Sequence, residues 1–243
     1  YTTEHTLSLH DALPIFLVMV FTLMSSMPGQ NGNGRGQGGQ GAGGGWDSLI
    51  SLPAEPISEA ELQGILSMRE EEKLARDVYL FLNDRWNQRT FTRISASEQQ
   101  HMDAVKMILD KYGIPDPIDG LPVGEFKSET MQTLYQILIV DGAASLEQAL
   151  VVGARIEDLD ISDLMKLITV TDNEDLLVLW QNLAKGSRNH LRAFTSRLQL
   201  FGLDYEPEYI PTELYIQIIE SDMERGFYDA SGNPAFSAPG WNN

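Results

Sequence analysis

After Pro56, hydrophobic residues recur at steps of three and four, and sustained alternation of polar and apolar residues is scarce. This spacing puts apolar side chains on one face of an α-helix, whereas alternation is typical of half-buried strands. The chain is therefore predicted to be all-α. The expected helices cover residues 58–83, 90–112, 128–140, 145–168, 171–201 and 211–225.

The ends of these segments carry helix-capping residues. Ser58 is followed three residues later by Glu61, the spacing of a capping box, and the segments that begin at 145 and 171 have the same pattern. Prolines cluster over residues 115–122, where a helix is not expected to continue. Four long helices joined across this segment predict a four-helix bundle with a long crossover and accessory helices.

The first 57 residues differ in composition from the rest. Residues 15–24 form an apolar run of ten, which is short for a membrane span but matches the core of a signal peptide. Because no Lys or Arg precedes this run, residues 1–27 are interpreted as a degenerate signal peptide or a read-through leader. A signal remnant would make the protein extracytoplasmic, either secreted or periplasmic; without one it would be cytoplasmic.

Glycine-rich sequence separates this leader from the helices. Between Pro28 and Gly45 lie ten of the chain's 21 glycines, and such a segment buries too little surface to repay its ordering entropy. Residues 28–57 are therefore predicted to be a flexible linker. Residues 58–226 are expected to form the bundle, and residues 227–243 an irregular tail.

Charge and composition exclude several classes of function. The chain carries 17 basic and 35 acidic residues, a formal net charge of −18, which disfavours binding to nucleic acid or anionic lipid. It has no cysteine, which excludes thiolate catalysis, iron–sulfur clusters and cysteine zinc sites. No apolar run is long enough to predict an integral membrane span.

Polar residues interrupt the predicted buried stripe of each long helix near its middle. The interrupting residues are Glu72, Glu98, His101, Glu157, Asp160, Ser187 and His190. A carboxylate that is buried without a partner costs several kcal/mol or takes up a proton. Interruptions at a similar depth in four helices therefore point to one shared polar site.

A pair of metal ions would compensate these side chains. Glu98 and His101 have the Glu-x-x-His spacing that places two ligands on one helix face. Glu157 with Asp160 is the all-carboxylate counterpart. An oxygen-rich set that includes imidazoles favours iron or manganese over structural zinc. Tyr79, on the same stripe as the first glutamate, would be a core tyrosine or would hydrogen-bond a ligand.

Each of these residues also has a purely structural interpretation. Glu72 ends a run of three glutamates, and such runs are usually solvated. His101 and His190 would then be core histidines, and Asp160 would face solvent while Ile161 points inward. Under this interpretation the bundle has a polar core without a metal.

Four motifs in the predicted bundle resemble a known family. They are EKLARDVY from Glu72, SEQQHMDAVKMILDKYG from Ser97, GARIEDLDISDL from Gly153 and GSRNHLRAF from Gly186. The first is similar to the E-x-x-A-R-x-x-Y pattern of rubrerythrin-type ferritin-like proteins. Over residues 58–226 the chain resembles the ferritin-like family known as domain of unknown function 2202. The resemblance implies a ferritin-like fold with a di-iron or related two-metal centre.

The resemblance also assigns ligand positions. It places metal ligands at Glu72, Glu98, His101, Glu157, Asp160 and His190. The fourth long helix departs from the pattern, because many di-iron relatives carry a second Glu-x-x-His there and this chain has Ser187 in place of that glutamate. The departure leaves the number of metal ions open.

Two functions follow from these observations. The first is an oxidoreductase or ferroxidase that uses two iron ions, or manganese, to reduce dioxygen or peroxide, with Tyr79 beside the ligands. The second is a non-catalytic bundle that sequesters metal or binds a partner, in which the metal site is incomplete or empty. Related bundles often pair, so a homodimer is one expected state, although no exposed apolar stripe requires it.

Overall fold

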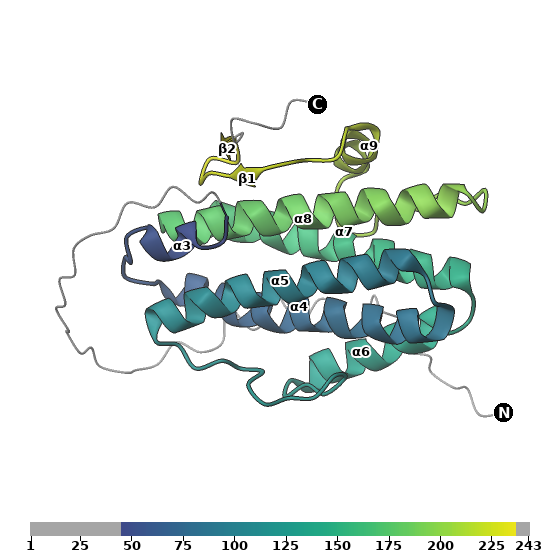
Figure 1. The fold of residues 1–243 in the computed structure, drawn as a ribbon, viewed down its shortest axis with the longest axis horizontal. Helices are drawn as coiled ribbons and strands as arrows, with labels where there is room; N and C mark the ends of the chain where they lie inside the picture. The colour runs from purple at the N-terminus through teal and green to yellow at the C-terminus, as the bar shows by residue number, and fades with distance from the viewer. Residues whose placement is uncertain (1–44, 237–243) are drawn as a thin grey trace. The chain divides into compact units, whose positions relative to one another are not determined.

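The structure, a computed structural model, describes residues 45–236 and is mostly helical (Figure 1). The helices are α3 (Ser48–Ser51), α4 (Glu59–Trp86), α5 (Arg89–Tyr112), α6 (Glu129–Gly142), α7 (Leu146–Val170), α8 (Glu174–Gln199) and α9 (Thr212–Glu220). Two short antiparallel strands follow, β1 (Phe227–Tyr228) and β2 (Pro234–Phe236). The all-α prediction is confirmed. Within residues 45–236, none of the helices is both long and apolar enough to cross a membrane.

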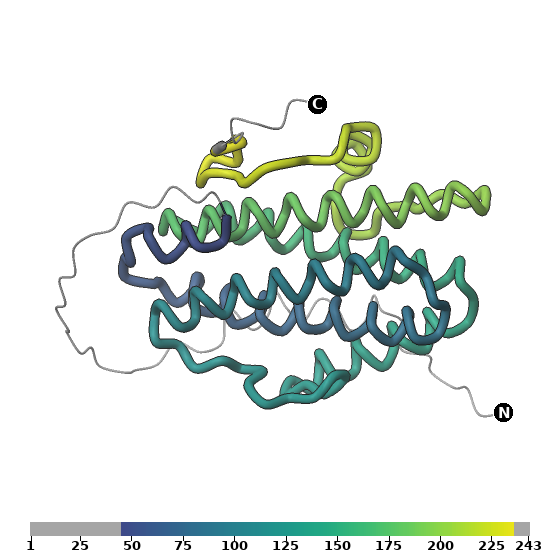
Figure 2. Tube along the Cα trace, in the orientation of Figure 1, coloured from purple at the N-terminus to yellow at the C-terminus, as the bar shows by residue number. Residues whose placement is uncertain are grey.

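The four long helices pack around a common core (Figure 1). Helix α4 lies along α5 and α7 along α8, and contacts of α4 with α7 and of α5 with α8 close the set. The crossover after α5 leads to α6, which packs on α4 and α7, as the tube in Figure 2 shows. Helix α9 and the strand pair lie against α8. This arrangement brings the middle of four helices together.

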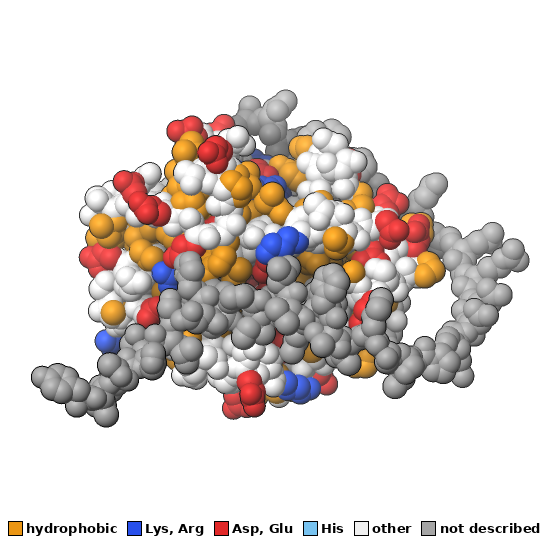
Figure 3. Space-filling view, turned by 180° about the vertical axis from the view of Figure 1, so that it is seen from behind, with side chains coloured by type: hydrophobic (Ala, Val, Ile, Leu, Met, Phe, Trp, Pro, Cys, Tyr) orange, Lys and Arg blue, Asp and Glu red, His pale blue; other side chains and the backbone are white. Residues whose placement is uncertain are grey.

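Apolar side chains of the four long helices form the core. Fully or almost fully buried are Ile65, Met68, Val105, Ile108, Leu164, Leu176, Trp180 and Leu183. Burial of apolar side chains such as these favours folding by about 25 cal/mol per Å² of apolar surface. On the face in Figure 3, red carboxylates occur at several separate places between apolar side chains.

Helix capping at the start of α4 is as predicted. The Ser58 hydroxyl accepts a hydrogen bond from the Glu61 backbone N–H at 3.2 Å, and the Glu61 carboxylate accepts the Ser58 N–H at 2.9 Å. Each side chain thus accepts a hydrogen bond from the backbone N–H of the other residue, and the capping box is confirmed.

The predicted start of the last long helix at Thr171 is wrong by three residues. Helix α8 begins at Glu174. The Thr171 N–H donates to the Leu167 carbonyl and so ends α7, while its hydroxyl accepts the indole N–H of Trp180. Thr171 therefore belongs to the preceding helix end, a role that local capping patterns do not reveal.

The two ends of the described chain also differ from expectation. Helix α3 lies within residues 28–57, where a flexible linker was predicted. Helix α9 ends at Glu220 rather than near residue 225, because Glu224 forms ion pairs with Arg188 and Arg192 of α8 and holds the following segment extended. The strand pair occupies part of the segment predicted to be irregular. The predicted leader at 1–27 and most of the predicted linker lie outside the described residues.

Buried charges on α4 fix the crossover. Lys73 pairs with Asp77 and donates to the Pro122 carbonyl at 2.8 Å, and Asp77 also accepts the Gly124 N–H at 2.8 Å. Arg69, one turn earlier on α4, forms an ion pair at 2.7 Å with Asp116 of the crossover. These contacts hold the loop against the helix that carries Glu72.

Candidate metal centre

Five polar side chains from the four long helices meet inside the protein. Glu72 comes from α4, Glu98 and His101 from successive turns of α5, Glu157 from α7 and His190 from α8. Their exposed fractions are only 2, 2, 4, 2 and 8%, respectively. The structure thus brings together five of the six predicted ligand residues in a site that bulk water scarcely reaches.

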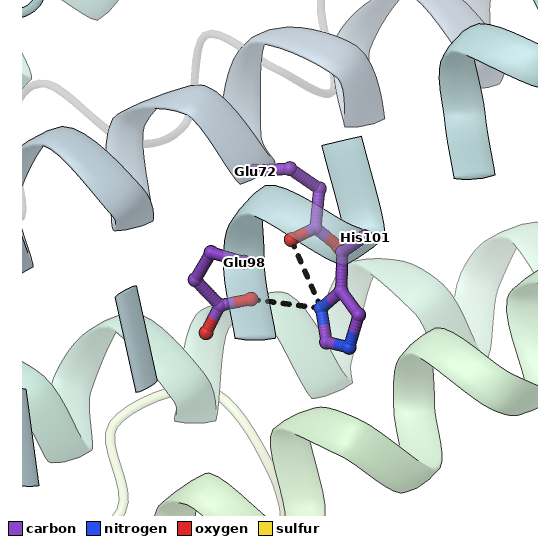
Figure 4. Close-up of side chains that lie close together, drawn as sticks. All are labelled: Glu72, Glu98 and His101. Carbon is purple, nitrogen blue, oxygen red and sulfur yellow. Dashed lines mark hydrogen bonds and ion pairs between the residues drawn. The ribbon is translucent and has the colours of Figure 1, made fainter. Parts of the chain in front are cut away.

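The first group of ligand atoms surrounds the His101 ring (Figure 4). Its Nδ1 lies 3.2 Å from Glu72 Oε2 and 2.7 Å from Glu98 Oε2. Both carboxylates point toward the same ring nitrogen, from two different helices. These three atoms form a set compact enough to hold one cation.

The second group uses the other oxygen of Glu98. Glu98 Oε1 lies 2.8 Å from His190 Nδ1, which is 3.4 Å from Glu157 Oε2. The two imidazole rings stack with their centroids 5.6 Å apart. Glu98 therefore joins two ligand groups, with one carboxylate oxygen in each.

Several ligand atoms in this site have no hydrogen-bond partner among residues 45–236. They are Oε1 of Glu72, Oε1 of Glu98 and Nδ1 of His190. The last two lie close together but are not aligned as a hydrogen bond. Each buried polar atom without a partner costs about 1–3 kcal/mol. A cation in each ligand group would give the clustered side chains a partner, and three carboxylates with two imidazoles form a donor set that suits iron or manganese. The residues fit a pair of metal ions.

The pKa values show how strongly these groups interact. Burial raises the pKa of Glu72 to about 8, against the opposing effect of His101. Burial alone would lower the pKa of His190, but the charges of Glu98 and Glu157 raise it to about 10. The charges of Glu72 and Glu98 likewise raise the pKa of His101 well above its usual value, despite burial. The two imidazoles hold the pKa of Glu98 below its usual range, although burial alone would raise it. Without metal, protons supply the positive charge that this site requires.

Comparison with known proteins places the chain in a family. Residues 61–222 match the family described as "Uncharacterized protein domain (DUF2202)". The chain belongs to this family. All five clustered residues lie inside the matched range.

A relative of this DUF2202 chain has a solved structure. The uncharacterized protein MJ0754 of Methanocaldococcus jannaschii is 53% identical over 178 residues, which cover 73% of this chain and 96% of that protein. The crystal structure of hypothetical protein MJ0754 from Methanococcus jannaschii DSM 2661 matches with a TM-score of 0.70, over 71% of this chain and 99% of that one. The two proteins thus share a fold.

Tyr79 contacts one of the clustered carboxylates. Its hydroxyl lies 2.5 Å from Glu157 Oε1 and 3.3 Å from the Gly153 carbonyl, and its ring packs against Phe91 and Phe194. Burial and the charge of Glu157 hold the pKa of Tyr79 well above its usual range. The phenol therefore keeps its proton and donates a hydrogen bond to Glu157.

Asp160 lies beside the two ligand groups and belongs to neither. It accepts a hydrogen bond from the Ser187 hydroxyl, and that hydroxyl also lies 3.1 Å from the Leu183 carbonyl. Burial and the charges of Glu72 and Glu157 hold the pKa of Asp160 well above its usual range. In this DUF2202 chain, the serine at the departing position thus pairs with the sixth predicted ligand. Direct metal binding by Asp160 stays a prediction.

Two residues that position the imidazoles were missed from sequence. A Cβ at Gly186 would lie 2.5 Å from Cε1 and 2.6 Å from Nε2 of His101, so glycine leaves room for the ring against α8. Ser97 Oγ lies 3.0 Å from Nε2 of His190. A glycine inside a helical pattern was the available signal for the first, because it weakens a helix unless packing requires it. For Ser97 the sequence carries no such signal.

Arginine does not compensate the clustered carboxylates in the described part of the chain. Arg76 contacts Asp77 and Gln99, and Arg188 contacts Glu224. A closed hydrogen-bond network through either arginine, which would explain a metal-free polar core, therefore has no support from these contacts.

Proposed function

We propose that this chain is a ferritin-like four-helix bundle with a dinuclear iron or manganese centre, and that it reduces dioxygen or peroxide as an oxidoreductase or ferroxidase. The ligands are Glu72, Glu98, His101, Glu157 and His190. The observation that carries the proposal is the shared carboxylate: Glu98 contributes one oxygen to each of two buried ligand groups.

Charge supports two ions in this site. Three carboxylates carry three negative charges, against four positive charges on two divalent ions, so the filled site is close to neutral if the imidazoles are neutral. Near-neutrality matters because an uncompensated charge is costly where nearly all water is excluded. Asp160, which lies next to the ligands, would complete the balance.

The residues of the chain have separate tasks in this proposal. Two reduced metal ions, when bound, would supply the electrons for reducing dioxygen or peroxide. Glu98 fixes the spacing of the two ligand groups, and the imidazoles of His101 and His190 orient the coordinating nitrogens. The Tyr79 hydroxyl stays protonated and donates a hydrogen bond to Glu157, which keeps that carboxylate in one orientation. Burial keeps bulk water away from the reacting atoms.

Metal content of the full-length protein tests the centre. After reconstitution with iron or manganese, plasma mass spectrometry should find about two ions per wild-type chain. We expect Glu98→Gln to lose both ions, because both groups share this residue, and His101→Ala to lose one. Glu70→Gln is the matched control: it makes the same change at a glutamate two residues from Glu72 that belongs to neither ligand group, so it should keep both ions. Unchanged metal content in the Glu98→Gln protein would refute the assignment.

The second candidate is a bundle that sequesters metal without turnover. The pairing of Ser187 with Asp160 favours it, because a glutamate ligand is replaced and the nearby carboxylate is already engaged. Steady-state consumption of oxygen or peroxide by the metal-loaded wild type, with ferrous ions or ascorbate supplied as the electron donor, separates the two. Consumption that Glu98→Gln abolishes supports the oxidoreductase, whereas stable metal binding without consumption supports sequestration.

A further inference from the structure

Two aromatic residues from opposite ends of the described chain cover the His101 side of the centre. The ring centroid of Trp46 lies 6.2 Å from that of His101, with the rings at 75°. The Phe227 ring contacts Trp46 from the other direction, edge-on, with centroids 5.4 Å apart. Both contacts have the edge-to-face geometry that stabilises aromatic pairs.

The two stacked imidazoles are the most exposed of the five candidate ligands. The side chains of His101 and His190 are 6 and 10% exposed, compared with 2–3% for the three glutamates. A solute that reaches the centre by the most exposed ligands therefore passes the imidazoles. Trp46 lies against the first of them.

The segment that carries Trp46 is fixed to the helical core. Leu49 is completely buried. The Lys111 ammonium donates to the carbonyls of Leu49 and Leu52 at 2.8 and 2.9 Å. The same ammonium pairs with Asp175 at 2.6 Å. Helix α3, which begins two residues after Trp46, thus contacts both α5 and α8.

The segment that carries Phe227 is fixed independently, by α8. The Asn182 side chain donates to the carbonyl of Tyr228 and accepts its N–H, both at 2.8 Å, as a neighbouring strand would. Lys185 donates to the Gly226 carbonyl at 2.6 Å. These bonds flank Phe227 on both sides, so its ring has a defined position against Trp46.

We propose that the pair Trp46–Phe227 forms a cover that sets the rate at which metal ions and small solutes reach the centre, without providing a ligand. Both residues lie outside the range that the DUF2202 family matches, residues 61–222. Neither side chain can bind a cation through a carboxylate or an imidazole. The metal part of this inference rests on the proposed function, whereas the exclusion of solutes from His101 does not.

The first test uses metal-free, full-length protein. Wild type, Trp46→Ala and Phe227→Ala are treated with diethyl pyrocarbonate at one fixed pH, and peptide mass spectrometry follows the modification of His101. Because Trp46→Ala removes two aromatic contacts, we expect modification about tenfold faster than in wild type. Trp86→Ala is the matched control: Trp86 lies at the far end of α4, bonded to the Gly142 carbonyl. Trp46→Phe keeps an aromatic ring at this position, so His101 should be modified nearly as slowly as in wild type. If Trp46→Ala acted only through a general loss of stability, an aromatic replacement would not be expected to protect His101 in this way.

The second test uses protein loaded with Mn²⁺ and measures its removal by EDTA. We expect faster removal from Trp46→Ala and Phe227→Ala, with the same number of ions bound as in wild type. Modification and removal at wild-type rates in both variants would overturn the cover. If no variant binds metal, the proposed function fails, and the modification of metal-free His101 still decides the cover. Circular dichroism establishes that each variant is folded, and Phe227→Ala replaces Trp46→Ala if the latter is not.

Discussion

At the scale of single residues, the position of the His101 ring depends on the absence of a side chain at Gly186. The ring lies against the α8 backbone, so that Nδ1 faces Glu72 and Glu98. Any Cβ at this position would overlap the ring. A helical glycine costs about 1 kcal/mol relative to alanine, and here the site requires that cost.

We predict that Gly186→Ala displaces His101 and removes only the first ligand group. Metal content should fall from about two ions to about one, because His190 and its partners are untouched. Gly142→Ala is a matched control, since its Cβ would meet Leu82 Cδ2 at the same 2.5 Å, outside the metal centre. Equal metal content in the two variants would contradict the positioning role.

Titration of the ligands predicts how metal binding depends on pH. In the metal-free protein Glu72 has a pKa of about 8 and His190 one of about 10. Both groups must lose a proton to bind metal, so the affinity for Mn²⁺ should rise between pH 6 and 10 and binding should release protons. Calorimetry in buffers of different ionisation enthalpy measures the released protons. Binding without proton release at pH 7 would contradict these pKa values.

At the scale of elements, α4 is the helix that connects the crossover to the candidate metal centre. Its buried Lys73 and Asp77 pair with each other and bind the crossover backbone. A buried pair adds little net stability, but removing one partner leaves the other charge without compensation.

We predict that Asp77→Ala lowers the free energy of unfolding by about 3–5 kcal/mol, because the Lys73 ammonium stays buried and the Gly124 N–H loses its acceptor. Asp110→Ala is the control. Asp110 forms an ion pair of the same i,i+4 spacing with Lys106, but both side chains are exposed. Removing this pair should change stability little. Urea unfolding followed by circular dichroism measures both. Similar midpoints for the two variants would show that burial of the first pair is unimportant.

At the scale of the whole molecule, the buried charges make stability depend on pH. The folded-state pKa values of Glu72 and His190 exceed their usual 4.5 and 6.5. Each group therefore stabilises the fold fully below its usual value and loses that contribution as pH rises through about 8 and about 10. Glu98, whose pKa is lowered, acts in the opposite direction and stabilises the fold above 4.5.

We predict that metal-free protein loses thermal stability between pH 6 and 10, and that bound Mn²⁺ reduces this loss, because the metal ions replace the protons. Scanning calorimetry at pH 6, 8 and 10, with and without metal, measures the effect. A melting temperature of metal-free protein that does not change over this range would contradict the assignment of the buried protons.

Local pattern was sufficient for much of the fold and for the candidate ligands. The spacing of apolar residues predicts the helices, and the capping box at Ser58 predicts where α4 begins. Polar interruptions of the stripes identify Glu72, Glu98 and Glu157, because helical periodicity alone decides which side chains point inward. The predicted helix ends were wrong where the end depends on a partner far away in the sequence. Helix α9 ends before the predicted residue 225 because Glu224 forms ion pairs with arginines of α8.

By itself, the sequence therefore determined the helical class, the DUF2202 resemblance and the candidate ligand residues, since these depend on periodicity and residue type. Only the tertiary structure decided that Glu98 joins two ligand groups, that Ser187 binds Asp160, and that Gly186 makes room for a ring. It also decided that Trp46 and Phe227 meet over His101. These relations depend on distances between segments far apart in the chain, which packing fixes and local pattern does not encode.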